Sequence, residues 1–96
     1  MELTSKQRAK LRGMAQAMEP VLHIGKEELT DNVIRQAEDA LTARELIKGT
    51  VQQNCPLTAR DACDALCEAT GAQPVGVIGR KFVLYRASKD KKKIEL

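Results

Sequence analysis

The chain alternates segments of helical periodicity with short apolar runs, and this alternation limits the folds that it can adopt. Thr4, Thr30 and Thr58 are suited to cap helices, because a threonine hydroxyl accepts the exposed backbone N–H groups of a first turn. Gln7 and Asp61, each three residues after its threonine, give the first and third segments the form of capping boxes. The three helices are expected to end at Pro20, near Thr42 and at Gly71.

Apolar residues in these segments recur every three or four positions, which places them on one face of a helix. The residues expected to face the core are Leu11, Met14, Ala15 and Met18 in the first helix, Val33, Ile34, Ala37 and Leu41 in the second, and Ala62, Leu66 and Ala69 in the third. The bases Lys6, Arg8, Lys10 and Arg12 flank the apolar stripe of the first helix. The exposed surface of that helix is therefore expected to be basic.

Short apolar runs between the helices predict strands. Residues 21–24 form one run and 45–51 a second, while 75–86 contains two runs around Gly79-Arg80, whose first glycine favours a type II′ hairpin turn. The order α-β-α-β-α-β-β predicts a single-domain α/β sandwich over residues 1–87, with one four-stranded mixed sheet and packed helices. Residues 88–96 lack apolar periodicity and are expected to form a basic, mobile tail.

The formal net charge of +3 is unevenly distributed along the 96 residues. There are five bases and two acids from Met1 to Lys26, four bases and nine acids from Glu27 to Gly79, and seven bases and two acids from Arg80 to Leu96. If the basic ends meet in the fold, they form a positive face of the kind that nucleic-acid-binding proteins present. A solvated surface with a lysine-rich tail would have the same composition, so charge alone leaves both interpretations open.

Cys55, Cys63 and Cys67 are an odd number of cysteines, which argues against a disulfide framework. Cys63 and Cys67 share one face of the third helix, but only Cys55 and His23 remain to complete a zinc site. Buried thiols are therefore favoured over metal ligands, and no metal or other cofactor is expected. No apolar run approaches the ~18–20 residues that span a bilayer, and Met1–Lys6 does not resemble a secretory signal, so a cytoplasmic protein is expected.

An enzyme needs a convergent acid, base or nucleophile. This sequence has one histidine, in a short apolar strand, and its acids are scattered over helix faces. It contains no P-loop, dinucleotide fingerprint or Ser-His-Asp arrangement. A non-catalytic protein without a small-molecule substrate is therefore expected.

The loop after the first predicted strand, Gly25–Thr30, leads directly into a helix. A glycine turn at a helix N-terminus directs free backbone amides and a partial positive charge toward one point, which suits a phosphate group. Gly25 permits close approach of the backbone, and Lys26 can reach a phosphate oxygen. One glycine before a helix is more often a simple turn, so this loop does not identify a site by itself.

Several short motifs follow one another in a familiar order: Leu3–Arg8, Leu11-Arg12, Pro20-Val21, Ile24–Lys26, Leu29-Thr30, Glu45–Lys48 and Ile78–Arg86. In these residues the chain resembles the CRM domain family, and more narrowly its stand-alone bacterial members, the YhbY-like RNA-binding proteins. The resemblance covers Leu3 to Arg86. It implies a fold similar to the C-terminal domain of translation initiation factor three, no catalytic activity, and association with ribosomal RNA in large-subunit precursors during ribosome assembly.

The resemblance also implies a GxxG loop, comparable with the loop of KH domains that clamps nucleotide backbone. Gly25 and Lys26 match its first half, whereas Glu28 occupies the second glycine position and Glu27 adds another acid. Either these acids point away and the loop still binds, or binding has moved toward the first helix and the Arg80-Lys81 turn. We expect all three regions to share the contact.

The residues expected to bind RNA, mainly through its phosphate backbone, are Lys6, Arg8, Lys10, Arg12, Gly25, Lys26, Arg80 and Lys81. Phe82 and Tyr85 are the only aromatic residues and are expected to pack in the core and the sheet. RNA binding should therefore depend on backbone and shape more than on base identity. The alternative is a small ribosome-associated protein–protein adaptor, which would dock through the acidic middle segment without direct RNA contact.

Overall fold

The computed structural model describes residues 3–88 and 94. Its elements, in chain order, are α1 (Ser5–Ala15), β1 (Leu22–Ile24), α2 (Asp31–Arg44), β2 (Leu46–Val51), α3 (Ala59–Thr70), β3 (Gln73–Ile78) and β4 (Lys81–Tyr85). This order confirms the predicted α/β fold. None of the helices in the described residues combines the length and the apolar character needed to cross a bilayer.

The helices begin where the threonine caps predict. The cap bonds run from the backbone N–H of Gln7 to Thr4 Oγ1 at 3.1 Å, of Val33 to Thr30 Oγ1 at 3.2 Å, and of Asp61 to Thr58 Oγ1 at 3.0 Å. The Gln7 side chain accepts the Thr4 N–H in return, which completes the capping box of α1. The predicted helix ends are less accurate: α1 ends before Pro20 is reached, and α2 continues past Thr42. The expected end of α3 is confirmed, because Gly71 caps it with a φ of 77°.

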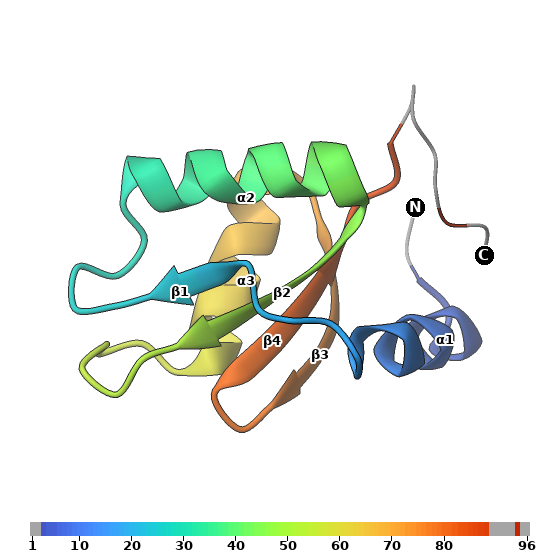
Figure 1. The fold of residues 1–96 in the computed structure, drawn as a ribbon, viewed down its shortest axis with the longest axis horizontal. Helices are drawn as coiled ribbons and strands as arrows, with labels where there is room; N and C mark the ends of the chain where they lie inside the picture. The colour runs from blue at the N-terminus through green and yellow to red at the C-terminus, as the bar shows by residue number, and fades with distance from the viewer. Residues whose placement is uncertain (1–2, 89–93, 95–96) are drawn as a thin grey trace.

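The four strands form one mixed sheet in the order β1-β2-β4-β3 (Figure 1). β1 runs parallel to β2, while β2 and β3 both run antiparallel to β4. Gly79 has a φ of 59° in the short β3–β4 turn, and primed hairpin turns require a positive φ at this position. The predicted hairpin is therefore present.

α2 and α3 pack on one face of the sheet and form the larger core. Its sheet residues come from alternate strand positions, and they are Leu22, Ile24, Ile47, Val51, Phe82 and Leu84. The Phe82 ring lies against the backbone of Gly49 on the neighbouring strand, where an added Cβ would overlap the ring. Only glycine fits at this point of the central strand pair.

α1 packs on the opposite face of the sheet and forms a second, smaller core. This core consists of Leu3, Leu11, Ala15, Leu46, Val75, Val83, Tyr85 and Ile94, with Met18 packed against it. Phe82 and Tyr85 are both buried, as predicted. Two predicted core residues are wrong: Met14 is 42% exposed, and Ala69 lies on the exposed side of α3.

Glu45 connects α2 to β2 with a φ of 65°, and its side chain is buried. Its two carboxylate oxygens accept the backbone N–H groups of Ser88 at 2.6 Å and Ile94 at 2.8 Å. Most of the predicted tail, residues 89–93 and 95–96, lies outside the described residues. At its two described positions, the chain is hydrogen-bonded to this turn.

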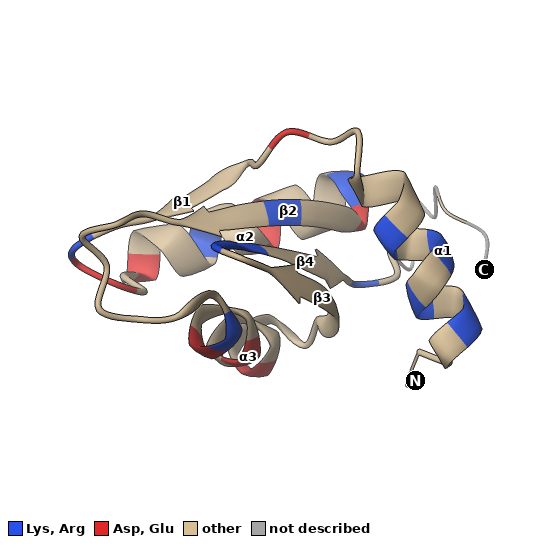
Figure 2. Ribbon diagram, turned by 90° about the horizontal axis from the view of Figure 1, so that it is seen from below, with Lys and Arg blue, Asp and Glu red and all other residues tan. Residues whose placement is uncertain are grey.

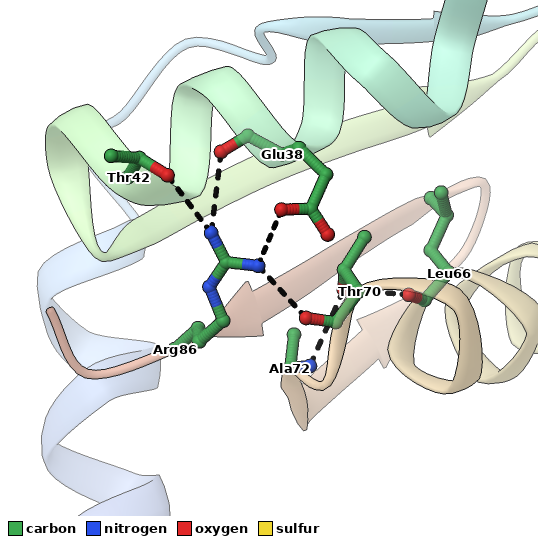
Figure 3. A network of polar contacts seen from close by, with 6 residues as sticks. All are labelled: Glu38, Thr42, Leu66, Thr70, Ala72 and Arg86. Carbon is green, nitrogen blue, oxygen red and sulfur yellow. Dashed lines mark hydrogen bonds and ion pairs between the residues drawn. The ribbon is translucent and has the colours of Figure 1, made fainter. Parts of the chain in front are cut away.

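Arg86 joins the C-terminal ends of α2 and α3 (Figure 3). Its Nη1 bonds the Glu38 carboxylate and the Thr70 carbonyl, both at 2.8 Å, and its Nη2 bonds Thr42 Oγ1 at 3.0 Å and the Glu38 carbonyl at 3.3 Å. The Thr70 hydroxyl donates to the Leu66 carbonyl and accepts the Ala72 N–H, which closes the end of α3. The guanidinium thus satisfies the Thr70 carbonyl, which the end of α3 leaves without an intrahelical partner, and it adds a second bond to the Glu38 carbonyl inside α2.

Replacement of Arg86 by alanine is expected to lower the free energy of unfolding by about 2 kcal/mol, because the Thr70 carbonyl at the end of α3 and the Glu38 carboxylate lose their charged donor. Arg60 offers a matched control: its ion pair with Asp64, at 3.6 Å, is exposed on α3. Arg60→Ala should cost less than ~0.5 kcal/mol. Urea denaturation of both variants measures the difference, and equal losses would contradict a special role for the Arg86 network.

Candidate nucleic-acid interface

α1 covers only part of the sheet face that it packs on. The strand register places four residues opposite one another across the uncovered part, one from each strand: His23, Thr50, Lys81 and Ile78. We call these four residues the open row. All are exposed except Thr50, which is half-buried. Because adjacent strands lie ~4.8 Å apart, the open row is roughly 14 Å long.

Lys48 lies on the same face as the open row, one step closer to α1. It pairs with Val83 across β2 and β4, and alternation along β2 places it on the same side as Thr50. Its ammonium donates to the carbonyls of Ala15 at 3.2 Å and Met18 at 3.4 Å, at and beyond the C-terminal end of α1. Lys48 was not among the predicted site residues, although the alternation of β2 contained the signal.

The four predicted bases of α1 lie on a helix that has no acidic residue. Lys6, Lys10 and Arg12 are exposed, and Arg8 is half-buried. Arg12 reaches over β3 into a hollow that it shares with Lys48 and Lys81. Arg8 faces a second hollow, and its buried Nε makes no hydrogen bond within the described residues. The basic surface of α1 therefore extends onto the sheet.

The Gly25 loop is a tight turn at the other end of the long axis from α1 (Figure 1). The Glu28 N–H donates to the Gly25 carbonyl at 3.0 Å, and Glu28 has a φ of 61°. Glu28 therefore adopts the left-handed conformation for which glycine is best suited, at the position where the GxxG pattern has its second glycine. Lys26, Glu27 and Glu28 are all exposed. The loop thus contains a left-handed turn in which Glu28 occupies the position of the second glycine of the GxxG pattern.

The Gly79-Arg80 turn lies at the same edge of the sheet as the Gly25 loop. The Val51 N–H donates to the Arg80 carbonyl at 2.8 Å, and the next amide, of Gln52, donates to the Ile24 carbonyl at 2.8 Å. The end of β2 is therefore hydrogen-bonded to both segments. Arg80 and Lys81 are exposed there, and Lys81 continues into the open row.

The predicted site residues consequently form an extended band and no single cluster. The two ends of the described chain do meet, since Leu3, Leu11 and Ile94 share the second core. They meet beside α1, at the opposite end of the long axis from the Gly25 loop (Figure 1). The reason is that α1 packs chiefly on β2, β3 and β4. Lys48 and Lys81 lie between the two ends of the band, as the basic positions of β2 and β4 show in Figure 2.

Acidic side chains outnumber basic ones in the layer formed by α2 and α3, whereas α1 carries only bases. Acids on the outer helices are Asp31, Glu38 and Asp39 of α2 and Asp61, Asp64 and Glu68 of α3. These helices cover the sheet face opposite the open row, which itself contains no acid. A chain with a net charge of only +3 thus has a one-sided distribution of charge.

The cysteines lie on the acidic side of the molecule. Cys63 is buried in the core, and Cys55 and Cys67 are half-buried; all three are free thiols. A hydrogen bond between Cys67 and Cys63 lowers the pKa of Cys63 and raises that of Cys67, and burial raises the pKa of Cys67 further. Within the residues that the structure describes, no three His, Cys, Asp or Glu side chains are grouped so as to hold a metal ion.

Comparison with known proteins decides the family. The family model described as CRS1 / YhbY (CRM) domain matches residues 3–86, which is most of the chain. The chain belongs to this CRM domain family. The predicted resemblance is therefore confirmed, and the matched range ends with Arg86, whose side chain ties together the ends of α2 and α3.

Relatives of this CRM domain have similar lengths. The “Probable RNA-binding protein YqeI” of Bacillus subtilis is 45% identical over 94 residues, covering 98% of each chain. A protein of Haemophilus influenzae named “RNA-binding protein” is 37% identical over 90 residues, covering 94% of this chain and 91% of its own. The solution structure of the hypothetical protein SAV1595 from Staphylococcus aureus has a TM-score of 0.82 at 44% identity, with 98% of each chain covered. The names of the two sequence relatives describe binding proteins and not enzymes, in agreement with the expected absence of catalysis.

The conformation of Glu28 in this CRM domain gives a prediction for stability. Glu28→Gly removes a left-handed strain of ~1–2 kcal/mol but increases the entropy of the unfolded chain, which offsets ~0.4–1 kcal/mol. Relative to Glu28→Ala, which also lacks the charge but keeps a Cβ, the glycine variant should therefore be about 0.5–1 kcal/mol more stable. Urea denaturation of the pair measures this difference, and a more stable alanine variant would refute the strained turn.

Proposed function

We propose that this protein binds RNA through the band of bases formed by α1, the open row and the two loops at the far edge of the sheet. The observation that carries the proposal is the uncovered half of the sheet, where Lys48 and Lys81 connect the basic helix to the Arg80 turn and the open row has no acid. Closely spaced bases on one face provide the electrostatic surface that a phosphate backbone requires. The names of the two relatives support the same chemistry.

The proposed contact is mainly with the phosphate backbone. Phe82 and Tyr85 are buried, so neither ring is exposed for stacking on bases as in single-strand binding domains. Exposed Lys and Arg side chains on α1, in the Gly25 loop and in the Arg80 turn instead provide flexible positive charges. Gly25 and Lys26 take part at the far end of the band, where Glu27 and Glu28 reduce the local attraction for phosphate.

The RNA proposed here is ribosomal RNA in precursors of the large ribosomal subunit. Support for this assignment comes from the resemblance to the stand-alone bacterial YhbY-like proteins, and the proposal places the protein in the cytoplasm during ribosome assembly. No catalytic step, metal or small-molecule substrate is part of it.

Charge-removing variants test the RNA-binding surface. Lys81→Ala, Lys26→Ala and the double variant Lys6→Ala/Lys10→Ala should each weaken binding to a short RNA hairpin, by roughly twofold to fivefold per lysine. Each lost phosphate contact should also reduce the slope of log affinity against log salt concentration by about 0.7–0.9. Arg35→Ala, on the exposed side of α2, removes one charge from the opposite layer and serves as the matched control. Equal losses in Lys81→Ala and Arg35→Ala would place the RNA elsewhere.

Sedimentation of a cell extract tests the cellular target. The protein should migrate with precursors of the large subunit, and ribonuclease treatment or high salt should release it, because phosphate contacts weaken steeply as salt rises. Migration at the top of the gradient under all conditions would contradict the ribosomal assignment. Migration with the particles that is insensitive to salt and lost in variants of the acidic helices would instead favour a protein–protein adaptor.

A further inference from the structure

A groove between α1 and the sheet lies at the middle of the basic band. It has a volume of about 250 Å³. Three bases line it, Arg12 from α1, Lys48 from β2 and Lys81 from β4, and none of its lining residues is acidic. A groove with this charge selects an anionic guest.

The remaining walls of the groove are largely apolar. Ala15 and Val83 contribute from the buried core between α1 and the sheet, and Ile78 forms one side. Ile78 is 75% exposed, and only one other large apolar residue in the described chain, Met14, is also exposed. An exposed isoleucine beside three bases provides apolar surface for a guest that is charged in one part and apolar in another.

Arg12 is held across the edge of the groove by a close approach to β3. A Cβ added to Gly76 would lie 3.0 Å from Cδ and 3.3 Å from Cγ of Arg12, so the aliphatic part of Arg12 rests on this glycine. The planar guanidinium that follows can stack on a flat ring or pair with a phosphate. Gln16 adds a neutral amide to the same wall.

The ammonium group of Lys48 is held in the groove by hydrogen bonds to the backbone at the end of α1. Its bonds to the Ala15 and Met18 carbonyls hold the ammonium beside α1. These bonds use two of the three N–H donors of an ammonium group, and the third can be shared with a guest.

We infer that this groove takes one unpaired nucleobase of the bound RNA, while Lys81 and Arg12 contact the phosphates on either side of it. The inference rests on the proposed function. A flat base fits the apolar wall, and its phosphates fit the three bases. The groove is also smaller than the ~300–1,000 Å³ typical of sites for drug-sized ligands, which suits a guest as small as one base. An apolar side chain of a partner protein would not require three cations.

This geometry selects an unpaired nucleotide and not a particular base. Gln16 is the one uncharged side chain in the groove with both donor and acceptor groups, so the means of reading a base edge are few. A base within a continuous duplex is stacked and cannot enter. The protein should therefore prefer RNA with a bulge or loop over continuous duplex RNA of the same charge.

Three hairpin RNAs test the inference: one with a single-nucleotide bulge, one with the bulged nucleotide abasic, and one fully paired. At one salt concentration, the protein should bind the bulged RNA roughly fivefold to tenfold more tightly than the other two. Ile78→Ser should remove this preference, so that the variant binds the bulged, abasic and paired hairpins with equal affinity. Met14→Ser alters the other exposed apolar residue, outside the groove, and should retain the preference. With 2-aminopurine as the bulged base, binding should change the emission in the Met14 variant but not in the Ile78 variant.

The outcomes separate this inference from the proposed function. Equal affinity for all three RNAs would overturn the groove inference and leave RNA binding intact, whereas no affinity for any of them at low salt would overturn both. A preference for the bulge that persists in Ile78→Ser would place the base elsewhere and overturn the inference. Equal affinity for the RNAs together with Ile78-dependent binding of a leucine-rich peptide would assign the groove to a protein partner instead.

Discussion

The central strand pair, β2 and β4, buries side chains on both of its faces, and the two faces are covered unequally. Two helices cover one face, whereas the other is covered only by α1 and by Leu3 and Ile94 at the ends of the described chain. An 11-residue helix is about 16 Å long and cannot cover a four-stranded sheet. Part of one sheet face therefore remains uncovered, and the bases of α1 lie beside it. The proposed interface follows from this incomplete second layer.

The uneven distribution of charge between the layers gives one face of the sheet more positive charge than a net charge of +3 suggests. Acids of α2 and α3 lie outside the covered face, while Lys48, Lys81 and Arg12 surround the uncovered part of the other. Exposed charges interact over roughly 10 Å at ordinary ionic strength, so the two sides of the sheet are largely independent. Arg86 does not join the basic band, because its charge is neutralised by Glu38 and its guanidinium bonds the last carbonyl of α3. The number of bases in the sequence therefore overstates the positive charge of the proposed interface.

The features predicted correctly from sequence are those that local interactions determine. Each threonine cap acts within one helical turn, and Gly79 acts within its own hairpin turn. The order of helices and strands can therefore be predicted from the sequence. Met14 was assigned to the core wrongly, because periodicity gives the spacing of an apolar stripe but not the angle at which a helix meets the sheet. Lys48 was missed for a related reason. Alternation shows which strand residues share a face, but only the position of α1 shows which part of that face is open.

The same limit applies to the Gly25 loop, where the sequence shows which residues are present but not the backbone conformation that they adopt. A glutamate in the second glycine position either changes the turn or is strained in it, and the φ of 61° at Glu28 shows the second outcome. The Glu28–Gly25 hydrogen bond within the turn and the Thr30 cap that follows it hold the turn in place, so the strain is tolerated. The loop therefore has a left-handed turn at Glu28, and its one lysine and two glutamates give it a net negative charge. In the proposed interface, attraction for phosphate therefore comes chiefly from α1 and the open row, and the loop contributes backbone amides and shape.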